Sequence, residues 1–169
     1  MAPSYSLRNE PRSWRPAYTN PDVAADALRT YRARFVPATP GARPHAILGL
    51  KVIVGEDDEH AGGLALPWHL ALVRHRAGQP GPLMSVEDAL AHRWSDAERE
   101  AERLVDRRAD VVAGPERAVA MIEEHVARTD ADEVIVTTNT FDRADRWGSL
   151  ERLALAAGVS VATVRAGSA

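Results

Sequence analysis

The sequence predicts an α/β fold in which parallel strands are joined by crossover helices. Two short apolar runs, residues 46–54 and 133–138, are rich in β-branched residues and are typical of strands buried on both faces of a parallel sheet. Segments with helical spacing of apolar residues lie before, between and after these runs. The 169 residues are enough for one domain with a sizeable core.

Residues 1–20 are polar and contain three prolines, a pattern that predicts a flexible N-terminal arm. Asn20 is then a suitable N-cap, and Pro21 suits the first position of a helix. The apolar residues that follow at helical spacing are Val23, Ala24, Ala27, Leu28, Tyr31 and Phe35. Pro37 and Pro40 end this helix.

The strand at residues 46–54 leads directly into an acidic segment, residues 56–59. Acidic side chains interact favourably with the start of a helix, so we expect a helix that ends near Arg76. Its apolar positions are Leu64, Leu66, Leu70 and Val73. Gly62, Gly63 and Pro67 oppose helix formation, which leaves the continuity of this helix open. Residues 77–94 predict a turn-rich crossing loop.

Three further signals complete the predicted order of elements. Ser95 and Glu98 form a capping-box pattern, and the helix that follows would carry Ala97, Ala101, Leu104 and Val105 on one face. We expect a short extended piece at residues 111–112. Residues 114–116 then start a helix whose inward residues would be Ala118, Met121, Ile122 and Val126. After the strand at 133–138 we expect a helix over 145–157, and a loose tail over 159–169.

Two clear strands are too few for this number of helices. They leave most apolar helix faces unopposed, and an open parallel sheet has exposed edges. The sequence therefore predicts that part of a larger fold is absent from these residues.

Six segments together resemble the luciferase-like flavin-dependent monooxygenases. They are YRARF at 31–35, GLKVIVGEDDEHA at 49–61, RAGQPGPL at 76–83, WSDAE at 94–98, VAGPERAV at 112–119 and ARTDADEVIV at 127–136. Each segment alone is common, but six in the right order are fairly specific. The resemblance covers residues 21–155 and corresponds to about the last 40% of a family barrel.

The resemblance implies a partial (β/α)₈ TIM barrel made of its C-terminal strands and helices only, over residues 21–158. It also implies flavin mononucleotide or reduced flavin as cofactor, with the deazaflavin F420 as another option, and monooxygenase chemistry with oxygen. The family's flavin phosphate loop lies upstream of the resembling region, and residues 2–6 do not match it. We therefore expect a truncated form that lacks most of the flavin site. The alternatives are an inactive remnant and a non-enzymatic module that completes a barrel with a copy of itself or with another chain.

Composition limits the partners and the compartment. The net charge of −3 gives no electrostatic reason for binding nucleic acid, and the four tryptophans are not interleaved with a basic stripe. The absence of cysteine fits a cytoplasmic protein without disulfides. No apolar run reaches the roughly 18 residues that span a bilayer, and the N-terminus has no stretch typical of a signal peptide.

Candidate site residues follow from the rule that a barrel carries its function after the carboxyl ends of its strands. Here those positions are residues 55–56 and Thr138, Asn139 and Thr140, whose side chains could bind a flavin or substrate, or serve only the turn. No catalytic residue is assigned. His60, His69 and His75 do not share one helix face, so we expect no metal site. His45, His92 and His125 show no acidic partner nearby in sequence, and His125 fits a packed position.

Overall fold

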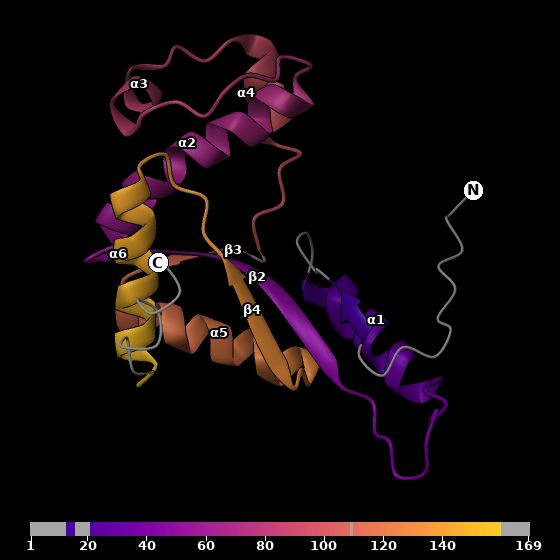
Figure 1. Cartoon of the computed structure of the whole chain (residues 1–169). Helices are drawn as coiled ribbons and strands as arrows, with labels where there is room; N and C mark the ends of the chain where they lie inside the picture. Colours follow the sequence, from indigo (N-terminus) through magenta and orange to yellow (C-terminus); the bar gives the residue numbers. More distant parts are fainter. Residues whose placement is uncertain (1–12, 16–20, 109, 160–169) are drawn as a thin grey trace.

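The computed structural model describes residues 13–15, 21–108 and 110–159 (Figure 1). They form a four-stranded sheet with β1 (Ser13–Arg15), β2 (Ala46–Val54), β3 (Asp110–Ala113) and β4 (Glu133–Thr137). Every strand pair is parallel, which confirms an α/β fold with parallel strands. Residues 1–20 were expected to be a flexible arm, but three of them, Ser13–Arg15, pair with β2. The expected N-cap, Asn20, lies outside the described residues.

Helices precede, connect and follow the strands. They are α1 (Pro21–Ala33), α2 (Asp58–Arg76), α3 (Val86–Ala91), α4 (Asp96–Glu102), α5 (Pro115–Thr129) and α6 (Arg143–Ala156). The prediction of a crossing loop over 77–94 was wrong in one respect, because α3 forms within it. Ser85 caps α3 by accepting a hydrogen bond from the Asp88 backbone N–H, a local signal that the turn-rich composition concealed.

The central strand of the sheet is β2. Residues 47–51 of β2 pair with β4, whereas residues 46–48 pair with β1 and residues 51–54 with β3. Because a strand has only two edges, β1 and β3 share the edge opposite β4. Only β2 and β4 were clear strands in the sequence, because β3 is four residues long and β1 three, which is too short for a periodic apolar pattern.

The larger core lies between one face of the sheet and α5 and α6. Alternate residues of β2 point to this face: Leu48, Leu50, Val52 and Val54. They pack with Val111, Ala118 and Leu153, and with the partly buried Val134 and Met121 among others. In Figure 1, α5 and α6 lie along the strands, while α2, α3 and α4 extend beyond the strands' carboxyl ends.

A smaller cluster covers part of the opposite face. Ile53 of β2 packs there with Leu64 and Ala65 of α2 and with Val112 of β3. The helix α2 is continuous through Gly62, Gly63 and Pro67, which answers the question that the sequence left open. Asp57 caps its start by accepting a hydrogen bond of 2.8 Å from the His60 backbone N–H.

Asp132 fastens α1 to the sheet. Its carboxylate accepts a 2.7 Å hydrogen bond from the Ala46 backbone N–H and lies 3.0 Å from the Arg32 guanidinium. The bond from Ala46 and the Arg32 charge hold the pKa of Asp132 below its usual value, against the opposing effect of burial. The starts of β2 and β4 and the end of α1 are thereby held at one point.

Two expectations about packing were wrong. The strand expected at 133–138 is not buried on both faces: no residue of β4 is fully buried, and Ile135 is 37% exposed. The helix after Ser95 ends at Glu102, so Leu104 and Val105 lie beyond it, and Leu104 and Ala97 are exposed. Its buried residues are Glu98 and Ala101, because α4 packs through a carboxylate rather than through a purely apolar face. None of the described helices is long and apolar enough to cross a membrane.

Candidate functional site

The three residues predicted at the rim of the sheet have different roles. The Thr138 hydroxyl donates a 2.8 Å hydrogen bond to the Val52 carbonyl, which ties the end of β4 to β2. Thr140 is fully buried, and its hydroxyl donates to the Asp142 carbonyl at 3.0 Å, in the turn that starts α6. The Asn139 side chain has no hydrogen-bond partner among the described residues, and it lines a cleft. Only Asn139 is therefore free to bind a ligand.

The cleft has a volume of about 420 Å³ and lies between α2, the carboxyl end of β4 and the segment after α4. Its walls are formed by Lys51, Trp68, Leu72, Arg76, Val105, Asp106, Thr137 and Asn139. Trp68, Leu72 and Arg76 follow one another at intervals of four residues, so they form one stripe along α2. With Lys51 on β2, the cleft is built from four segments that are distant in sequence.

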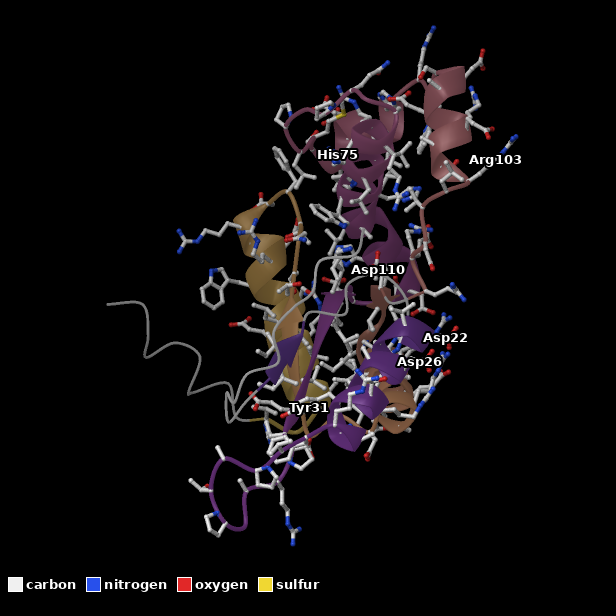
Figure 2. The ribbon with its side chains drawn as sticks, turned by 90° about the vertical axis from the view of Figure 1, so that its right-hand side faces the viewer. Asp22, Asp26, Tyr31, His75, Arg103 and Asp110 are labelled. Carbon is white, nitrogen blue, oxygen red and sulfur yellow. The ribbon has the colours of Figure 1, made fainter. Side chains whose placement is uncertain are left out.

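Lys51 lies at the floor of this cleft and is held on two sides. Its ammonium nitrogen is 3.0 Å from the Asp110 carboxylate and 4.9 Å from the centre of the Trp68 ring. Both side chains of the ion pair are about one-tenth exposed, which makes the pair stronger than a surface pair. The parallel register explains the contact, because Lys51 is directly opposite Asp110 on β3 and Thr137 on β4. Figure 2 shows Asp110 near the middle of the molecule, below His75 and Arg103.

The other charges of the cleft differ in their pairing. The Asp106 carboxylate binds the Arg108 side chain with two hydrogen bonds of 2.8 and 3.1 Å. These bonds, together with one from the Arg108 backbone, lower the pKa of Asp106 to about 2, so this carboxylate is ionised at neutral pH. Arg76 is exposed at the end of α2 and has no ion-pair partner among the described residues. Arg76 is therefore the cation of the cleft that is free to bind an anion.

A second polar cluster fixes α4 against α2 and the end of α3. Glu98 is 2% exposed, and both of its carboxylate oxygens lie 3.1 Å from Nε2 of His92. The Ser95 backbone N–H donates to the same carboxylate at 2.7 Å, which completes the predicted capping box. Burial opposes ionisation of Glu98, but the bonds from Ser95 and His92 outweigh it, so the pKa of Glu98 lies below its usual value. This cluster positions the segment that supplies Val105 and Asp106 to the cleft.

The histidines have partners that sequence spacing did not reveal. His92 pairs with Glu98, His45 with Glu133 at 3.1 Å, and His69 with Glu102 at 3.1 Å. The expectation that His92 has no acidic partner nearby in sequence was wrong, because Glu98 lies only six residues away. For His45 the expectation agrees with the structure, since its partner Glu133 lies 88 residues away in sequence. His125 is buried as predicted, and burial lowers its pKa. The described residues contain no group of three acidic or histidine side chains that could hold a metal ion.

Sequence reasoning missed Lys51, Trp68 and Arg76. A signal was available for the first, since Lys51 is the only lysine of the chain and interrupts an apolar strand. Nothing in the sequence indicated that Trp68 and Arg76 line the same cleft as Lys51, because that depends on where α2 packs. These three residues make the cleft a polar site with an apolar wall.

Comparisons with known proteins give a consistent set of relatives. No protein-family model matches the sequence. The chain is 31% identical over 140 residues to the uncharacterized protein YvbT of Bacillus subtilis, covering 82% of this chain and 41% of that protein. It is 28% identical over 137 residues to a luciferase-like monooxygenase of Escherichia coli K12, covering 78% of this chain and 39% of that protein.

A solved structure agrees with these sequence relatives. The crystal structure of apo-MsnO8 superimposes with a TM-score of 0.72 at 28% sequence identity, over 83% of this chain and 42% of that one. The chain thus spans about two-fifths of the length of the proteins it matches. Together, these distant similarities support a relationship between this chain and the luciferase-like monooxygenases.

Proposed function

We propose that the chain is a domain of a luciferase-like flavin-dependent oxidoreductase and supplies the late strands and helices of a (β/α)₈ barrel. The observation that carries this proposal is the similarity to proteins named luciferase-like monooxygenase over 78% of the chain, at only about two-fifths of their length.

The described residues form an incomplete flavin site. Of the three rim side chains, two hydroxyls are engaged by backbone carbonyls, which leaves the Asn139 amide as the free group. A flavin needs a phosphate site and several groups around its ring, because the protein supplies binding and orientation while the flavin supplies the redox chemistry. Flavin-dependent activity then requires the part of the barrel that the relatives have and these 169 residues do not include.

The isolated chain tests the first half of this proposal. We expect residues 1–169, expressed and purified, to show little or no visible flavin absorbance and to bind added flavin mononucleotide or F420 weakly. Tight binding of one flavin per chain would show that the site is complete within these residues, and would contradict the proposal.

A chimera tests the second half. A luciferase-like relative that itself retains flavin would receive residues 21–158 in place of its own matching segment, and the same relative with that segment deleted is the control. We expect the chimera to retain flavin and the deletion to lose it. A folded chimera that binds no flavin would reject the assignment.

The second candidate function is a non-enzymatic module that completes its sheet by association. The observation that favours it is the free edge of β4 among the described strands, with Ile135 of this strand 37% exposed. Sheet edges with unpaired backbone groups are sites of strand pairing. In purified protein only a second copy of the chain can fill this edge, so light scattering would detect the association.

A further inference from the structure

The cleft at the end of α2 has the composition of a ligand site that does not depend on a flavin. Among its lining residues two side chains are cationic, Lys51 and Arg76, and one is anionic, Asp106. Lys51 and Asp106 are already paired, with Asp110 and Arg108 respectively. Among the charged residues that line the cleft, Arg76 alone has no ion-pair partner among the described residues, so the unpaired charge of the cleft is positive.

The remaining wall is largely apolar and comes from two sides. Trp68 and Leu72 precede Arg76 on the same stripe of α2, and Val105 lies on the segment that follows α4. One stripe therefore runs from an aromatic ring through an aliphatic side chain to an unpaired guanidinium. From Trp68 to Arg76 it spans about 12 Å, at a rise of 1.5 Å per residue.

The contacts of Lys51 restrain the aromatic wall of the cleft. The Lys51 ammonium lies over one face of the Trp68 ring, and its bond to Asp110 holds the ammonium there, so the indole has one fixed contact before any ligand arrives. Held aromatic side chains bind flat aromatic partners at a small entropic cost. A guanidinium binds a carboxylate through two parallel hydrogen bonds.

We propose that this cleft binds an aromatic carboxylic acid, with its ring system against Trp68, Leu72 and Val105 and its carboxylate at Arg76. Asn139 provides a hydrogen bond at the floor, next to Thr137. The site goes beyond the proposed function, because it is formed by the described residues and needs neither flavin nor the absent part of the barrel.

The test is isothermal titration calorimetry of the full chain, in the absence of flavin, with 2-naphthoate and with the neutral amide 2-naphthamide. We expect naphthoate to bind at one site per chain and naphthamide about tenfold more weakly, because the amide lacks the charge that Arg76 recognises. Equal binding of both compounds, or binding of neither, would overturn the proposal.

Two matched variants assign the charge to its residue. Arg76→Gln removes an exposed cation and leaves the core intact, so we expect naphthoate binding to weaken about tenfold while naphthamide binding stays unchanged. Arg34→Gln removes another exposed arginine, at the end of α1, and should leave both affinities unchanged. An unchanged naphthoate affinity in Arg76→Gln would overturn the proposal.

Inorganic phosphate distinguishes an aromatic acid site from a general anion site. We expect phosphate to compete poorly with naphthoate, since it makes no contact with Trp68, Leu72 or Val105. Competition at similar concentrations would overturn the assignment of the ligand class.

The naphthoate experiments and the flavin experiments can fail independently. A chimera that does not bind flavin leaves the naphthoate result intact, and a failed naphthoate titration leaves the chimera result intact.

Discussion

Glu98 shows what one residue contributes beyond the pattern in which it occurs. The spacing of Ser95 and Glu98 predicted the capping box correctly. The burial of the carboxylate could not be predicted, because it depends on contacts from other elements: His92 at the end of α3, and Arg74 on α2, whose Nε lies 3.9 Å away. A local motif was thus visible in the sequence, and its tertiary role was not.

We predict that Glu98→Gln lowers the free energy of unfolding at neutral pH by about 1–3 kcal/mol. The neutral amide loses the charge-assisted bonds to His92 and Ser95 and turns a donor towards one of them. Chemical denaturation followed by circular dichroism measures the change. Glu100→Gln, on the same helix but exposed and paired only with Arg103, is the control and should change stability by less than about 0.5 kcal/mol.

The pH dependence of this difference has a definite sign. The pKa of Glu98 is lowered from 4.5, so its stabilising effect is present above pH 4.5 and is lost as the pH falls through the lower folded-state value. The difference in free energy of unfolding between the wild-type chain and Glu98→Gln should therefore become smaller at acid pH. A difference in free energy of unfolding that stays constant from pH 7 to pH 3 would show that the charge of Glu98 does not stabilise the fold.

At the scale of elements, α2 shows how packing overrides local preference. Two glycines and a proline lie inside this helix, and all three disfavour helices. The helix persists because it buries apolar side chains along its length, among them Ala61, Leu64, Leu70 and Val73. The start of α2 was predictable from its acidic segment and its end from the apolar positions, whereas its continuity depended on contacts with the sheet and with α3 and α4.

The glycines around α2 have opposite roles, which gives a matched pair of variants. A Cβ atom on Gly55 would lie 2.2 Å from the Ala61 backbone nitrogen, whereas a Cβ on Gly62 would meet nothing within 4 Å. We predict that Gly55→Ala destabilises the chain, because the end of β2 and the first turn of α2 must separate. Gly62→Ala should instead stabilise it by about 0.5–1 kcal/mol through helix propensity.

Thermal denaturation of the two variants measures both effects. A lower midpoint for Gly55→Ala with a higher one for Gly62→Ala is the expected pair. If Gly55→Ala were as stable as the unaltered chain, the close approach of β2 and α2 at this point would be wrong.

At the scale of the whole molecule, the sequence predicted the α/β class and the order of the long elements. The extended piece expected at residues 111–112 lies within β3. The sequence did not predict β1 or the order of strands in the sheet, because pairing partners are set by tertiary packing. The cleft was missed for the same reason: Lys51 lies on β2 and Trp68 and Arg76 lie on α2, so they line one cleft only when these elements pack together. Of the predicted rim residues, only Asn139 belongs to it.

The free edge of β4 leads to the last prediction, which concerns association. The five residues of β4 include neither Lys nor Pro, the residues that commonly protect edge strands, and Ile135 is 37% exposed. We predict that the purified chain self-associates in a concentration-dependent way in light scattering. Ile135→Lys should shift the chain towards the monomer, because a charge on an edge strand opposes pairing.

The control variant is Val36→Lys. It changes an apolar residue that is 71% exposed in the loop after α1, away from the sheet, and should leave association unchanged. A well-folded wild-type chain that remains monomeric at all concentrations would show that β4 does not need a partner strand, and would leave the enzyme domain as the better of the two functions.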